Sequence, residues 1–128
     1  MRCLIDTHVA LFMWVSPEKL SNRVRVLLEN KANEIYFSQV SVWEITLKYG
    51  LKKLRLPISP DLYIPDRLKK LDLTYTPLTN EAIYGVLGLP EIHRDPFDRL
   101  LISTALDLGI PLISRDPFIQ QYPLQVLW

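Results

Sequence analysis

The sequence contains few of the residues that cross-link a chain, form phosphate-binding loops or anchor it in a membrane. Cys3 is the only cysteine, so no disulfide can form within the chain, and we expect a reducing compartment or a plain core position. The four glycines form no Walker-type phosphate loop. No apolar run approaches the roughly 18 residues of a membrane span, and the amino terminus has no signal-peptide pattern. We therefore expect a small soluble protein of the cytoplasm, with no membrane partner.

The sequence also has little net charge. Fifteen Lys and Arg residues against fourteen Asp and Glu residues give +1, so no global field attracts nucleic acid. Residues 48–70 nevertheless hold seven basic and two acidic residues, a local charge of +5. Such a run is most often a solvated helix face, but it would also suit an enzyme that acts on a polyanion.

The length and the order of elements predict the fold class. A chain of 128 residues, 48% apolar and 23% charged, fits one globular domain over residues 1–128. Short strands alternate with helices, which predicts a three-layer α/β/α fold with a short central parallel sheet. We expect strands at 2–5, 34–38, 73–77, 110–114 and 124–127, and helices at 9–15, 18–30, 39–54, 66–71, 79–87 and from about 98 to 108.

The segment 9–15 is apolar on every side of its predicted helix. Phe12 and Trp14 differ by two positions, so they point to different faces. A helix of this kind is either fully buried by its own fold or covered by another chain. The sequence leaves both explanations open.

Four acidic residues fall at positions where an α/β fold places ligands. Asp6 follows the first strand, and Asp116 follows the strand at 110–114. Ligands bind at the carboxyl ends of parallel strands where the winding reverses, so these two acids share a crevice if their strands are neighbours. Glu44 within a helix and Asp98 at a helix start can reach the same edge through right-handed crossovers.

Each acid also has a simpler explanation as a helix cap or a surface ion pair. Asp-Pro pairs are typical of helix starts, and an acid four residues before a lysine forms a helical ion pair. These explanations apply to Asp6, Asp95, Asp98 and Asp116 as capping residues and to Glu44 as the partner of Lys48.

Convergence of the acids would create a cation site. Neighbouring carboxylates raise one another's pKa unless a cation compensates them. Oxygen ligands with no adjacent cysteine or well-spaced histidine pair select Mg²⁺ or Mn²⁺ over Zn²⁺. His8 and His93 have no partner at ligand spacing, so we expect them to be structural or solvated.

Four stretches of the chain resemble one family. They are Leu-Ile-Asp-Thr-His-Val-Ala-Leu at 4–11, Ser-Val-Trp-Glu-Ile at 41–45 with Gly-Leu-Lys-Lys-Leu at 50–54, His-Arg-Asp-Pro-Phe-Asp-Arg-Leu-Leu-Ile at 93–102, and Pro-Leu-Ile-Ser-Arg-Asp at 111–116. Together they resemble the PIN-domain ribonucleases, and within them the VapC-like toxins of bacterial toxin–antitoxin pairs. The stretches span the chain in the family's order.

The resemblance implies an acidic metal centre and its chemistry. The family's four acids fall on Asp6, Glu44, Asp98 and Asp116, which would hold Mg²⁺ or Mn²⁺ and activate water for cleavage of RNA phosphodiester bonds. Family members often place a hydroxyl near the metal, and the matching positions here are Thr7 and Ser114. Asp95 belongs to a motif of one subgroup, and all three residues are expected to support the metal centre. The residues expected to contact RNA are Lys48, Lys52, Lys53 and Arg99.

The resemblance also implies partners. VapC-like toxins form homodimers and bind a cognate antitoxin protein. Arg94, Arg99 and Arg115 lie near the acids in sequence and would either pair with them or contact RNA phosphate. Trp43 is expected to pack, although an exposed tryptophan there could stack on a base.

Two other classes of function remain for comparison. A PIN-fold module that binds RNA or an antitoxin without cutting would not need all four acidic positions filled. A phosphatase or phosphotransfer domain needs paired acids after the first strand, whereas Asp6 is followed by Thr7-His8. We therefore expect a metal-dependent endoribonuclease, with the identity of its RNA left open.

Overall fold

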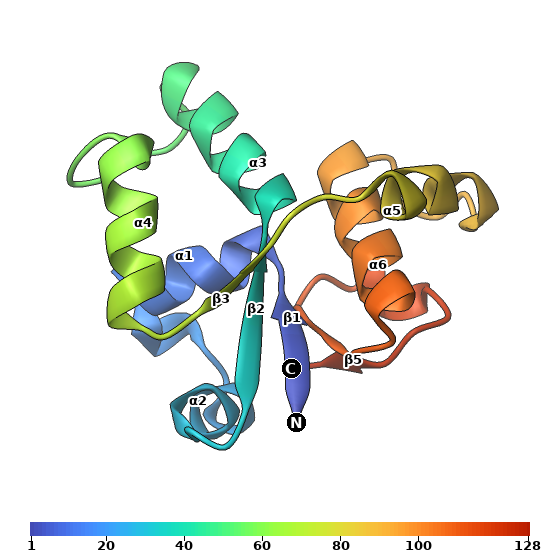
Figure 1. Ribbon diagram of the computed structural model, residues 1–128, viewed down its shortest axis with the longest axis horizontal. Coiled ribbons are helices and arrows are strands. Elements are labelled where there is room, and N and C mark those ends of the chain that lie inside the picture. The colour runs from blue at the N-terminus through green and yellow to red at the C-terminus, as the bar shows by residue number, and fades with distance from the viewer.

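The computed structural model describes residues 1–128 and contains one five-stranded sheet between helices (Figure 1). The strands are β1 (Arg2–Ile5), β2 (Glu34–Ser38), β3 (Thr74–Thr76), β4 (Leu112–Ile113) and β5 (Val126–Leu127). The helices are α1 (Thr7–Val15), α2 (Asn22–Glu29), α3 (Gln39–Gly50), α4 (Pro60–Lys70), α5 (Asn80–Gly85) and α6 (Pro96–Leu108), with single 3-10 turns at 17–19, 86–88 and 119–121. None of these helices is both long enough and apolar enough to cross a bilayer.

The sheet is parallel throughout, with the strand order β3-β2-β1-β4-β5. From β1 the chain adds β2 and β3 on one side, then returns to place β4 and β5 on the other side. The winding therefore reverses between β1 and β4, where Ile5 lies beside Ile113. The predicted three-layer α/β/α class with a short parallel sheet is confirmed.

Alternate residues of the sheet belong to two separate hydrophobic cores. Cys3 and Ile5 of β1 belong to the core beneath α1, α2 and α4, and Leu4 belongs to the core beneath α6. This alternation is the period-2 pattern of a sheet covered on both faces. In Figure 1, α1 to α4 lie on one side of β1 and β2, and α5 and α6 lie on the other. Helix α3 follows β2 directly and contacts both α1 and α6.

Two predicted helix boundaries are wrong. Helix α3 ends at Gly50 rather than at Leu54, because Lys52 takes a left-handed conformation (φ 60°) and the Lys53 N–H donates to the Lys48 carbonyl at 2.9 Å. Helix α4 begins at Pro60 rather than at residue 66 and contains Pro65 in its interior. Burial of Tyr63 and Ile64 on the core outweighs the one backbone hydrogen bond that Pro65 removes.

Other boundaries differ by smaller amounts. The predicted helix at 18–30 is a 3-10 turn followed by α2, which starts afresh because the Ser21 hydroxyl accepts a hydrogen bond from the Val24 N–H at 3.1 Å. The predicted strands at 110–114 and 124–127 keep only two paired residues each. The strands at 2–5 and 34–38 are confirmed as predicted.

The fold itself buries both large aromatic residues of α1. Phe12 is 8% exposed beside Trp128, and Trp14 is 9% exposed between Phe37 and Tyr63, with ring centroids 5.4 and 5.8 Å away. The core explanation for segment 9–15 is therefore confirmed for these two residues. The apolar character of this helix carries no argument for a partner chain.

Gly109 is the glycine whose backbone most constrains substitution. It ends α6 in the left-handed region (φ 67°), and a Cβ there would touch nothing. We expect Gly109→Ala to lower the free energy of unfolding by about 1 kcal/mol through backbone strain alone. Gly50 has equal space but a helical backbone, so Gly50→Ala should raise that free energy by about 0.5 kcal/mol. Urea unfolding of both variants checks this, and equal shifts would contradict it.

Candidate active site

The sheet topology brings the two strand-end acids together as the sequence suggested. Asp6 follows β1 and Asp116 follows β4 by three residues, and these strands are neighbours at the point where the winding reverses. The Asp6 N–H donates to the Ile113 carbonyl at 3.1 Å, which extends the pairing of the two strands to their carboxyl ends. The two carboxyl groups therefore share the crevice in which open α/β sheets bind ligands.

Asp6 has both a structural role and a place in the site. Its Oδ1 accepts a hydrogen bond from the Val9 N–H at 2.8 Å, so it caps α1. The residue is only 3% exposed, and burial raises the pKa of its carboxyl group. The Ser114 hydroxyl and the Val9 N–H oppose that shift, because both stabilise the ionised form.

Glu44 is the most completely buried acid, with 1% exposure on α3. Its Oε2 forms an ion pair with Lys48, which confirms the simpler explanation for this residue. Its Oε1, however, is buried and has no hydrogen-bond partner in the structure. A buried carboxylate oxygen without a partner is costly, so this atom fits a position that faces a bound cation.

Asp98 is the second acid of the site whose ionisation its surroundings disturb. It lies at the start of α6 with 5% exposure. Burial raises its pKa to about 7, and the charges of Asp95, Asp6 and Glu44 act in the same direction. These charges act on Asp98 because α1, α3 and α6 direct their acids to one place. The structure thus brings together the acids that the resemblance predicted.

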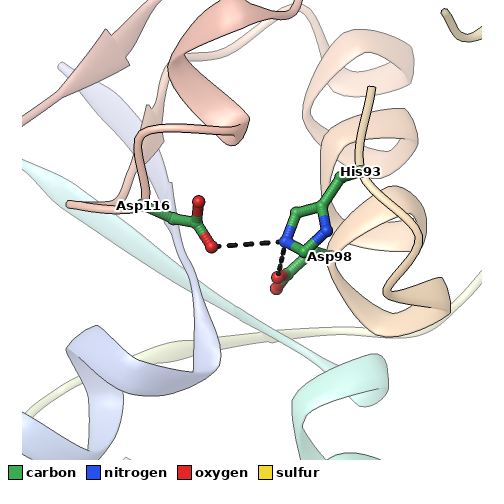
Figure 2. Close-up of side chains that lie close together, drawn as sticks. All are labelled: His93, Asp98 and Asp116. Carbon is green, nitrogen blue, oxygen red and sulfur yellow. Dashed lines mark hydrogen bonds and ion pairs between the residues drawn. The ribbon is translucent and has the colours of Figure 1, made fainter. Parts of the chain in front are cut away.

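His93 lies in this cluster, although the sequence offered it no partner at ligand spacing. Its Nε2 lies 2.8 Å from Oδ2 of Asp98 and 3.3 Å from Oδ2 of Asp116 (Figure 2). One ligand atom from each of the three residues lies within 4.8 Å of the other two. Figure 2 shows the imidazole between the loop that carries Asp116 and the first turn of α6.

Two hydrogen bonds fix how His93 faces the acids. The Asp95 N–H points at Nδ1 at 3.3 Å, and the Tyr122 hydroxyl accepts the His93 N–H at 2.7 Å. With Nδ1 accepting, the ring proton is assigned to Nε2, which donates toward the two carboxylates. Residues 89–95 have no periodicity, so the signals for His93 were its closeness to Asp98 and its place at the start of the stretch 93–102.

Hydroxyl groups and caps hold the carboxylates in place. The buried hydroxyls of Thr7 and Ser41 are 2.9 Å apart and link α1 to α3, and Ser41 was not predicted. The Ser114 hydroxyl accepts a hydrogen bond from the Asp116 N–H at 3.1 Å. Asp95 caps α6, since its Oδ1 accepts from the Phe97 N–H at 2.9 Å. Asp95 therefore reaches Asp98 through its charge.

The basic residues expected to bind RNA occupy different environments. The Lys48 ammonium is paired with Glu44. The Arg99 guanidinium donates to the carbonyls of Val86 and Pro90 at 3.1 and 2.8 Å, so it fastens a loop rather than presenting free donors. Lys52 and Lys53 lie exposed on the turn after α3.

The donor set fits a divalent cation. Carboxylate oxygens dominate it, which suits Mg²⁺ or Mn²⁺. A bound cation would give Oε1 of Glu44 a partner, and its positive charge would lower the raised pKa of Asp98. The expected ligands that fit are Asp6, Glu44, Asp98 and Asp116, with His93 beside them.

The raised pKa of Asp98 predicts how stability depends on pH. The folded protein holds this proton more tightly than the unfolded chain between the ordinary value of 3.8 and about 7, so its stability falls as pH rises through that window. Asp98→Asn removes the free-energy cost of ionising this buried carboxyl group. We expect it to raise the Tm of metal-free protein by about 5 °C at pH 8, and by less at pH 5. A lower Tm at pH 8 would contradict this origin of the shift.

Comparison with known proteins places the chain in a family. Residues 3–123 match the family described as "PIN domain". A stretch of 49 residues, 38% of this chain, is 37% identical to Ribonuclease VapC16 of Mycobacterium tuberculosis, and the match spans 35% of that relative.

Solved structures of low sequence identity share the fold. A chain of VapBC2 from Rickettsia felis, bound to a promoter DNA fragment, has a TM-score of 0.67 at 18% identity, and 99% of this chain and 98% of that chain are covered. A chain of DNA-bound VapBC from Salmonella typhimurium has a TM-score of 0.68 at 14% identity, with coverage of 99% and 97%. The family match covers most of the sequence and agrees with the topology, and the chain therefore belongs to the PIN domain family.

Proposed function

We propose that the protein is an Mg²⁺- or Mn²⁺-dependent endoribonuclease and the toxin of a toxin–antitoxin pair. The observation that carries the proposal is the convergence of buried acids at the switch point, with Oε1 of Glu44 unpartnered. The relative named Ribonuclease VapC16 supports the same reaction.

The four acids would hold the cation and orient the reacting groups. A divalent cation held by these acids would supply Lewis-acid chemistry, which favours activation of a water molecule and stabilises charge on phosphate oxygens. His93 keeps Asp98 and Asp116 in register through its Nε2–H. The Thr7–Ser41 contact holds α1 against α3, and with them the backbone that carries Asp6 and Glu44.

The RNA would approach over the carboxyl-terminal end of α3. Lys48, Lys52 and Lys53 lie at or after its last turn, within the basic segment 48–70. Trp43 is 55% exposed, contrary to the expectation that it packs, and it adjoins Glu44 in sequence. An exposed indole beside a phosphodiester site suits base stacking, which contributes about 1–3 kcal/mol per base.

We also propose a cognate antitoxin and a second copy of this chain as partners, in the cytoplasm. Solved neighbours of the same fold were crystallised as VapBC and FitAcB.

RNA cleavage by the purified chain tests the reaction. A pool of structured RNAs is incubated with Mg²⁺, with Mn²⁺ or with EDTA. We expect cutting only with metal, and a loss of at least about 100-fold in rate for Asp6→Asn and for Asp98→Asn, because each removes a cation ligand.

The matched control is Asp107→Asn. Asp107 lies on α6 with Asp98 but is exposed near the far end of the helix, so its removal changes the charge and leaves the site intact. It should cut at the rate of the parent chain. Cutting that persists in EDTA, or a parent chain that binds RNA without cutting it, would overturn the nuclease proposal in favour of a binding module.

A further inference from the structure

Arg115 turns away from the acids that surround it in sequence. It precedes Asp116, yet its guanidinium carbon lies 4.6 Å from the ring centroid of Phe12 on α1. The side chain is exposed and takes part in none of the ion pairs or hydrogen bonds of the structure. Asp116 instead faces His93 and the Phe118 N–H. Of the two roles left open for Arg115, pairing with Asp116 is therefore not the one that the structure shows.

A second cation converges on the same ring. The Lys19 ammonium lies 5.6 Å from the Phe12 centroid, and Lys19 also has no acidic partner in the structure. The His8 ring is 6.5 Å away from the same phenyl ring. Two positive charges without acidic partners are therefore both attracted to one phenyl ring.

The Phe12 ring is a fixed support rather than a mobile surface group. It is 8% exposed and packs against Trp128, with a centroid distance of 6.5 Å. A guanidinium that lies over such a ring keeps its N–H edges free, and those edges match the oxygens of a phosphate. Arg115 is thus pre-positioned, and little side-chain entropy remains to be lost on binding.

The chain connects this cationic pair directly to the acidic site, since Arg115 immediately precedes Asp116. Helix α1 starts directly after Asp6, and Phe12 comes six residues later, about 9 Å along the helix axis. Helical side chains lean toward the amino terminus, which brings the ring nearer to the acids.

We propose that Arg115 and Lys19, held on Phe12, form a subsite for a backbone phosphate of the RNA next to the bond that is cut. This inference rests on the proposed function and adds a second contact region to the lysines after α3. The subsite recognises the charge of a phosphate and not the RNA sequence, because a phosphate contact carries no sequence information. It sets the position of the strand and leaves the chemical step to the acids.

Binding of a fluorescent RNA, measured by anisotropy, tests the subsite. The Asp98→Asn background prevents cutting, and the dissociation constant is measured over a range of salt concentrations. We expect Arg115→Gln to weaken binding by about tenfold at low salt and to reduce the slope of log K against log salt by about 0.7, the value for one phosphate contact on a single strand. Lys19→Gln should reduce that slope as well.

Two further variants test the planar shape of the Arg115 guanidinium and the support that the Phe12 ring gives it, and a third variant is a control. Arg115→Lys should keep the salt slope but bind more weakly than the parent, because an ammonium lacks the planar fork. Phe12→Leu keeps both charges and should also weaken binding, because the support is gone. Lys31→Gln removes an exposed charge near the amino-terminal end of β2 and should change neither quantity. Circular dichroism and Tm confirm that each variant is folded.

The outcomes distinguish this inference from the nuclease proposal. If Arg115→Gln matches Lys31→Gln in affinity and in salt slope while the unmutated chain still cuts RNA, the subsite is wrong and the nuclease proposal stands. If the unmutated chain neither binds nor cuts RNA, both are overturned.

Discussion

Burial of carboxylates that also repel one another is the constraint on which this site depends. Asp6, Glu44 and Asp98 are each at least 95% buried, and their charges act on one another. The chain supplies two partial compensators, Lys48 for Glu44 and His93 for Asp98. They do not suffice, because Asp98 keeps a raised pKa and Oε1 of Glu44 keeps no partner. The remaining cost is one that a bound cation removes.

The fold tolerates this cost because the acids are fixed by elements that are stable for other reasons. The backbone at Asp6 is held by the pairing of β1 with β4 and by its own cap on α1. Asp98 is held by α6, which begins with the Asp95 cap and ends in the left-handed Gly109. Two apolar cores pack these helices against opposite faces of the sheet. A site of this kind is pre-organised, so the ligand does not need to order it.

The sequence predicted the layers and the four acids because both depend on local pattern and topology. Strand ends mark the edge where Asp6 and Asp116 meet, and right-handed crossovers bring Glu44 and Asp98 to the same edge. His93 was missed because a loop has no periodicity, and its place depends on the Tyr122 and Asp95 contacts. The start of α4 was predicted wrongly from its prolines, because tertiary packing outweighed their local preference against a helix.

Calorimetric titration with Mn²⁺ tests the central claim most directly, because it measures cation binding without any RNA. At about pH 6.5, in two buffers of different ionisation enthalpy, we expect binding that releases protons, since the cation displaces the proton that Asp98 holds with its pKa of about 7. Asp98→Asn should reduce that release and weaken binding. The absence of binding, or equal binding and proton release in both proteins, would contradict the account.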